Sequence, residues 1–73
     1  MTFNDFLPLI HRGVEGSFYL VDTKEGYCIV CKNRYDLILE LKERDMLSNL
    51  SYEVVGIQPH GEHSIIIEFE KRR

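Results

Sequence analysis

The stretch SFYLVDTKEGYCIVC, residues 17–31, decides the fold because it contains two strand-forming segments and the turn between them. Residues 17–22 and 27–31 are rich in β-branched and aromatic side chains, which favour strands. The intervening residues 23–26 are polar and end in glycine, which is typical of a hairpin turn. We therefore predict a β-hairpin over residues 17–31.

Both faces of this hairpin are apolar. Phe18 and Leu20 point to one side of a strand, whereas Tyr19 and Val21 point to the other. A sheet that packs against a single layer of helix needs only one apolar face. We expect either the N-terminal helix or another chain to cover the second face.

Residues 32–49 form the clearest helix of the sequence. Asn33 is a favourable N-cap with Asp36 three positions later, and Glu40 can pair with Arg44 one turn on. The apolar residues form two stripes, namely Leu37, Ile38 and Leu41, and then Tyr35, Leu39 and Met46. One stripe suffices to cover a sheet, so the second is surplus.

Two further strands are expected at residues 51–58 and 64–71. Gly56 in the first indicates a bulge or a close approach of another group. In the second, Ile66 is an apolar exception on the face that carries Glu68 and Glu70. The side chains expected to pack against the central helix are Val54 or Val55, Ile57, Ile65, Ile67 and Phe69.

A short helix precedes the first hairpin and ends near residues 11–13. Its apolar face consists of Phe3, Phe6, Leu7 and Ile10. Thr2 and Asp5 have the spacing of a capping box, but Pro8 would then remove a helical hydrogen bond. With Asn4 or Asp5 as the cap, Pro8 would fall in the first turn, where it is tolerated. Both alternatives stay open.

The chain is therefore predicted to be one small α+β domain spanning residues 1–73, with the order α-β-β-α-β-β. The expected architecture is a four-stranded antiparallel sheet of two hairpins with the central helix packed on one face.

Composition and charge narrow the function classes. The net charge is −3 with neither sign segregated, whereas a general nucleic-acid binder carries a basic face. No apolar run approaches the about 20 residues of a membrane helix, and residues 1–10 do not resemble a signal peptide. We expect a cytoplasmic protein with reduced thiols and no membrane association.

Cys28 and Cys31 have the spacing C-x-x-C, but they lie in a predicted strand, where residues three apart point to opposite faces. They are therefore not expected to share a metal ion or a disulfide. If the strand ends at Val30, Cys31 lies just before the Asn33-capped helix and could be a somewhat reactive thiol.

His60 and His63 bracket a predicted turn and could at most bind a metal weakly, with help from Glu62. No nucleophile motif, phosphate loop or paired-carboxylate signature is present, and a chain this short leaves little room for a ligand pocket. We expect no enzymatic activity and no cofactor.

The order of elements, the turn in LVDTKEG, the Leu-rich helix and the closing strands EVVGIQ and SIIIEFE are similar to a recurring pattern. The chain resembles small α+β proteins from phages and mobile elements of Gram-positive bacteria. The resemblance covers most of the chain and implies an accessory protein. It transfers no catalytic or binding residue.

The leading hypothesis is a protein-interaction module, acting as a homodimer through surplus apolar surface. The candidate interface residues are Tyr19, Val21, Tyr35, Leu39, Met46 and Ile66. The alternatives are a nucleic-acid accessory protein that uses Arg12, Lys32, Arg34 and the tail at 71–73, and a small metal-binding protein.

Overall fold

The computed structural model describes residues 1–10 and 16–72. Its elements in chain order are α1 (Phe3–Phe6), the 3₁₀ helix η1 (Leu7–Leu9), β1 (Ser17–Asp22), β2 (Cys28–Cys31), α2 (Arg34–Glu43), β3 (Tyr52–Pro59) and β4 (Ser64–Lys71). The α+β class and both predicted hairpins are confirmed, because β1 pairs antiparallel with β2, and β3 pairs antiparallel with β4.

The sheet is mixed, so the prediction of a wholly antiparallel sheet is wrong. Its strand order is β2-β1-β4-β3, and the central strands β1 and β4 are parallel. The helix between the hairpins explains the difference. Because α2 carries the chain back along the sheet, β3 starts in the same direction as β2, and β4 consequently runs parallel to β1.

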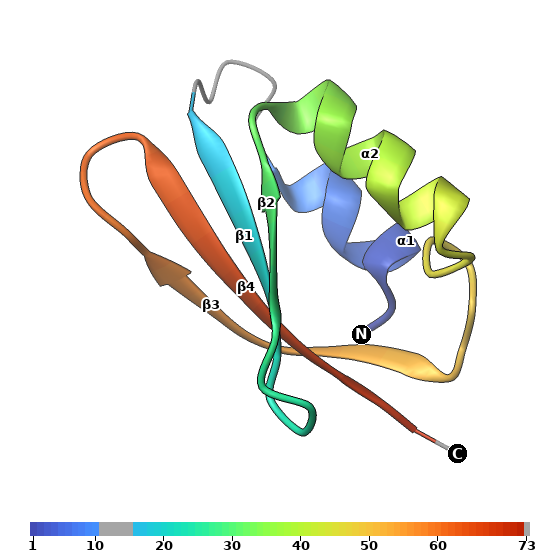
Figure 1. Ribbon diagram of the computed structural model, residues 1–73. Helices are drawn as coiled ribbons and strands as arrows, with labels where there is room; N and C mark the ends of the chain where they lie inside the picture. Colours follow the sequence, from blue (N-terminus) through green and yellow to red (C-terminus); the bar gives the residue numbers. More distant parts are fainter. Residues whose placement is uncertain (11–15, 73) are drawn as a thin grey trace.

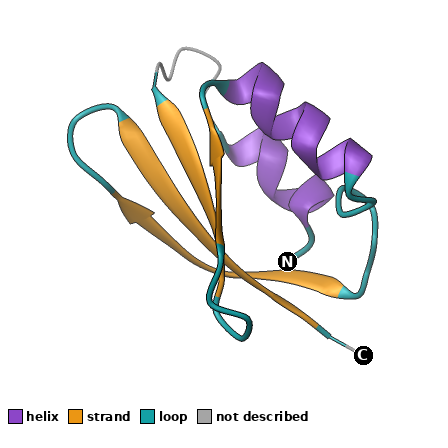
Figure 2. Ribbon diagram, in the orientation of Figure 1, coloured by secondary structure: helices purple, strands orange, loops and turns teal. Residues whose placement is uncertain are grey.

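Both helices lie on the same face of the sheet (Figures 1 and 2). The expectation that the N-terminal helix might cover the second face is therefore wrong. The core between helices and sheet contains Phe3, Phe6, Leu7, Ile10, Phe18, Leu20, Ile29, Cys31, Leu37, Leu41, Met46, Val54, Ile67 and Phe69. All the large apolar burial in the described residues is thus on one side of the sheet.

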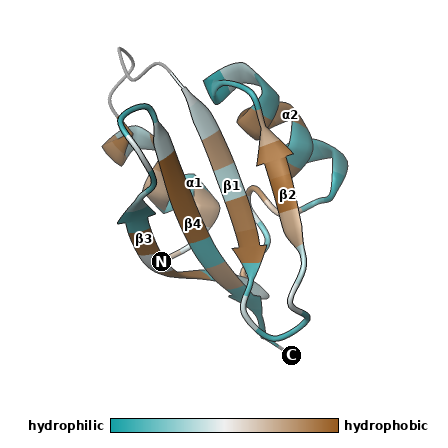
Figure 3. Ribbon diagram, turned by 60° about the vertical axis from the view of Figure 1, so that its left-hand side comes forward, coloured by the Kyte–Doolittle hydropathy of each residue, from teal (hydrophilic) through white to brown (hydrophobic). Residues whose placement is uncertain are grey.

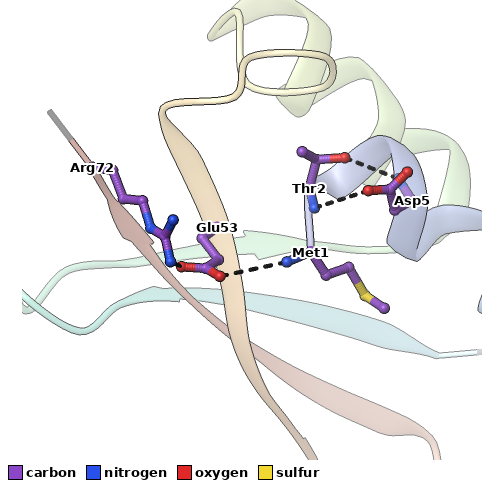
Figure 4. A network of polar contacts seen from close by, with 5 residues as sticks. All are labelled: Met1, Thr2, Asp5, Glu53 and Arg72. Atoms are coloured by element: carbon purple, nitrogen blue, oxygen red, sulfur yellow. Dashed lines mark hydrogen bonds and ion pairs between the residues drawn. The ribbon is translucent and has the colours of Figure 1, made fainter.

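The structure decides which residue caps the N-terminal helix. Thr2 is the N-cap, and its hydroxyl accepts from the Asp5 amide at 3.2 Å while the Asp5 carboxylate accepts from the Thr2 amide at 3.4 Å (Figure 4). The α-helix ends at Phe6, before Pro8, and the chain continues as η1. Pro8 is compatible with its place at the start of η1, because its missing N–H would have no helical partner there.

The central helix is shorter than predicted. Asn33 is its N-cap as expected, but it ends at Glu43, because Asp45 adopts a left-handed conformation with φ 55°. The amide of Met46 donates to the Leu41 carbonyl at 2.8 Å, and that of Asp45 donates to the Lys42 carbonyl at 3.1 Å. This is a Schellman motif, which turns the following apolar residue towards the helix.

Met46 consequently lies in the core with 1% of its surface exposed. Its predicted place in an interaction surface is wrong, since it is not on the helix stripe that contains Tyr35 and Leu39.

Gly56 marks a bulge in β3, as predicted, because the register with β4 shifts between Val54 and Gly56. A Cβ at Gly56 would lie 2.7 Å from Glu68 Oε1, so the close approach is present as well. Val54 packs in the core, whereas Ile57 beyond the bulge is 50% exposed. The expectation that Ile57 packs against the helices is therefore wrong.

Candidate interaction surface

The face of the sheet that points away from the helices carries apolar residues on β2, β1 and β4, three strands that lie side by side (Figure 3). In the strand register Tyr19 lies opposite Val30 on one side and opposite Ile66 on the other. Val21 lies opposite Cys28 in the next row. We call these residues the open-face cluster: Tyr19, Val21, Cys28, Val30 and Ile66.

The cluster is accessible. Val30 is 60% exposed, Cys28 is exposed, and the other members are half-buried by their neighbours on the sheet. The burial of β2 alternates strictly, so that Ile29 and Cys31 face the helices while Cys28 and Val30 face outward. No described helix lies over this face of the sheet (Figures 1 and 3).

Polar groups border the cluster on the side of β3. The Gln58 amide donates to Glu68 at 2.8 Å, and the His60 ring meets the Tyr19 ring edge-on with centroids 5.3 Å apart. Further along, Glu53 forms an ion pair with Arg72 (Figure 4). The open face is therefore apolar on β2, β1 and Ile66 of β4, and polar on β3 and at Glu68 of β4.

The structure brings together three of the predicted interface residues and separates the others. Tyr19, Val21 and Ile66 belong to the open-face cluster. Tyr35 and Leu39 are 70% and 38% exposed, but they lie on α2, on the helix side of the sheet. They form a separate surface from the cluster.

Two members of the cluster, Cys28 and Val30, were not among the predicted interface residues. The signal was present in the sequence CIVC, because strand alternation places residues 28 and 30 on the same face. What the strand pattern alone leaves open is which of the two faces the helices cover.

The two cysteines face opposite sides of the sheet, as predicted. Cys28 is exposed and Cys31 is buried, and neither forms a disulfide. Burial raises the pKa of the Cys31 thiol to about 11, with smaller contributions from the carboxylates of Glu40 and Asp36. The suggestion that Cys31 is a reactive thiol is therefore wrong, because a thiol with this pKa stays protonated at neutral pH.

The side chains that were predicted to bind a metal or a nucleic acid do not form a cluster among the described residues. His63 and Glu62 are exposed, with 3.9 Å between Nε2 and Oε2, and the described residues contain no group of three metal-ligating side chains. Lys32 and Arg34 lie at the start of α2, whereas Lys71 and Arg72 lie at the opposite end of the sheet (Figure 1). Arg12 and Arg73 fall outside the described residues.

A groove of about 560 Å³ lies at the far end of the sheet, which is more space than we expected in so short a chain. It is lined by Tyr27, Tyr52 and the buried Asp22, among other residues. Asp22 Oδ1 accepts from the amides of Lys24 and Glu25, both at 2.9 Å, so this carboxylate holds the β1–β2 turn. Lys71 lies over the Tyr52 ring at 5.6 Å. Asp22 and Lys71 in the groove thus have structural partners.

Tyr27, which lines the same groove, has a raised pKa. Its partial burial is the main cause, and the negative charge of Asp22 adds to it. A phenol with a raised pKa stays protonated at neutral pH, so the groove contains no activated base or nucleophile at this position.

Among the described residues, no helix is long and apolar enough to cross a membrane. Comparison of the chain with protein-family models, with curated proteins and with solved structures gives no match. The resemblance to small phage and mobile-element proteins therefore stays a prediction.

Proposed function

We propose that this protein is a non-enzymatic interaction module that binds through the open-face cluster and associates with a second copy of itself. The observation that carries the proposal is the row Val30–Tyr19–Ile66, which crosses three neighbouring strands on the face opposite the helices. Contiguous apolar side chains of this kind on a small domain mark interaction sites.

The proposal is supported by the chemistry of the cluster. Its side chains carry no charge, and Tyr19 contributes an aromatic ring of the type enriched at interface cores. The charged residues Glu53 on β3, Glu68 on β4 and Arg72 just after β4 can form a polar rim beside the cluster. An apolar centre with a polar rim is the usual composition of a protein–protein interface.

Sedimentation velocity over a wide concentration range tests the proposal. We expect reversible dimerisation that survives high salt, because the contact is mainly apolar and salt screens only charged pairs. A sedimentation coefficient that stays at the monomer value up to high concentration would contradict self-association through this face.

A further inference from the structure

The two edges of the sheet differ in how their outward backbone groups are used. At the β3 edge, the amide of Val54 donates to the Met1 carbonyl at 2.8 Å, and the amide of Tyr52 donates to the Asn49 carbonyl at 3.2 Å. Pro59 has no amide hydrogen, and the bulge after Val54 interrupts the edge. These are the devices by which natural sheets prevent pairing with another strand.

The β2 edge has outward groups of a different kind. The Asp22 amide donates to the Tyr27 carbonyl at 2.9 Å, which fixes residues 22 and 27 as a hydrogen-bonded pair of the antiparallel ladder. Since bonded and non-bonded pairs alternate along such a ladder, Ile29 and Cys31 bond to β1. The amides and carbonyls of Cys28 and Val30 therefore point away from the sheet.

These outward groups have no backbone partner among the described residues. Strand β2 contains no charged residue, no proline and no bulge, and it carries the most exposed member of the open-face cluster. A second copy of β2 would meet it without placing like charges opposite each other. The edge is therefore open to pairing.

We propose that two copies of this protein pair antiparallel through their β2 strands, about a two-fold axis at Ile29. This inference rests on the proposed function and specifies how the two copies meet. In this pairing, the backbone amide and carbonyl of Cys28 in each copy lie opposite those of Val30 in the other copy. Cys28 and Val30 can therefore each donate one hydrogen bond and accept one across the joint. The sheets of the two copies become one continuous sheet.

In the register about Ile29, every outward residue that forms a pair lies within β2. Pairing Cys28 with the same residue of a second copy would bring Gly26 opposite Val30, and pairing Val30 with itself would bring Lys32 opposite Cys28. Gly26 and Lys32 lie outside β2. The isologous pairing about Ile29 also places the two open-face clusters side by side on one surface, which doubles the apolar face available to a further partner.

Disulfide formation between copies tests this register. Residues directly opposite in a hydrogen-bonded pair have Cα atoms about 5.5 Å apart, within the range that a disulfide spans. The diagonal neighbours are about 7–8 Å apart, which is too far for efficient bonding. Cys28 is the accessible thiol of the natural chain, because Cys31 is buried.

The experiment mixes the natural protein with the double variant Cys28→Ser/Val30→Cys under mild oxidation and identifies products by intact mass. Both substitutions are at exposed positions of β2, and circular dichroism checks that the variant folds. We expect the mixture to give the disulfide-linked heterodimer, and each protein alone to give at least about tenfold less linked dimer, because the like thiols are diagonal.

The other outcomes separate the two proposals. Efficient linking of either protein alone would overturn the register about Ile29. A dimer in sedimentation with no linking in the mixture would overturn the edge pairing but leave self-association through the open face standing. A monomer at all concentrations would overturn both.

Discussion

Val30 of β2 and Tyr19 of β1 lie directly opposite each other, and both side chains point to the face that the helices leave open. Val30 is 60% exposed, whereas its chain neighbours Ile29 and Cys31 are buried under the helices. Strand β2 thus contributes one face to the core and the other face to a candidate interface.

Replacing Val30 with Asp should strongly weaken self-association, because it places a charge from each copy at the β2 edge where the two strands meet, and charged edge residues oppose strand pairing. Val30 is 60% exposed, so the monomer should lose little stability, about 1 kcal/mol. Sedimentation velocity measures the first effect and urea unfolding the second. The matched control is Leu39→Asp on α2, which should leave association unchanged. Equal loss of association in both variants would show that the interface is not on the open face.

Met46→Ala should destabilise the fold by about 2–5 kcal/mol, because it leaves a cavity beneath the Schellman turn. Tyr35→Ala, at a residue that is 70% exposed, should change the free energy of unfolding by less than about 0.5 kcal/mol. Chemical denaturation of both variants makes the comparison. Similar values for the two would mean that Met46 is not a core residue.

Gly16→Ala should be far more damaging than Gly26→Ala. A Cβ at Gly16 would lie 1.3 Å from the His63 carbonyl oxygen, and the backbone there has φ +129°. Gly26 also has a positive φ, of +75°, but a Cβ there meets no atom within 4 Å. Gly26→Ala should therefore cost only the backbone strain, about 1–2 kcal/mol. Thermal unfolding would contradict this account if the two variants melted together.

Stability should fall as the pH rises from about 9 towards about 11, in part because of Cys31. Its pKa rises from 9.0 in the reference state to about 11 in the folded protein, chiefly through burial. The folded state therefore holds this proton more tightly than the unfolded state, so the resulting stability is complete below about pH 9 and is lost progressively as the pH rises to about 11. The measurement is urea unfolding as a function of pH, and the slope should be shallower in Cys31→Ala. An unchanged slope in that variant would contradict the assignment.

The local features of the fold could be predicted from sequence because they depend on neighbouring residues. The Thr2–Asp5 capping box and the Asn33 cap are short-range hydrogen bonds between residues three positions apart. The Gly56 bulge was likewise indicated by the residue itself. In each case, the residue that produces the feature also identifies it in the sequence.

Other features depend on distant parts of the chain and could not be predicted in this way. Strand alternation shows that β1 has two apolar faces, but it does not show whether β1 will pair with β4 or which face both helices will cover. The position of Met46 was missed for a local reason, since Asp45 takes the left-handed place that glycine usually occupies after a helix. Because strand alternation does not show which face of β2 the helices cover, the predicted surface contained Tyr19, Val21 and Ile66 but not their neighbour Val30.

The most direct test of the central claim, that two copies join at the β2 edge, is sedimentation of Val30→Pro. The amide of Val30 points away from β1, so proline at this position removes an outward donor without breaking the hairpin. Ile29→Pro is the control, because the Ile29 amide belongs to the β1–β2 ladder and its loss should destabilise the fold. We predict that Val30→Pro is a folded monomer at concentrations where the natural protein is a dimer. A Val30→Pro protein that dimerises as tightly as the natural chain would contradict the claim.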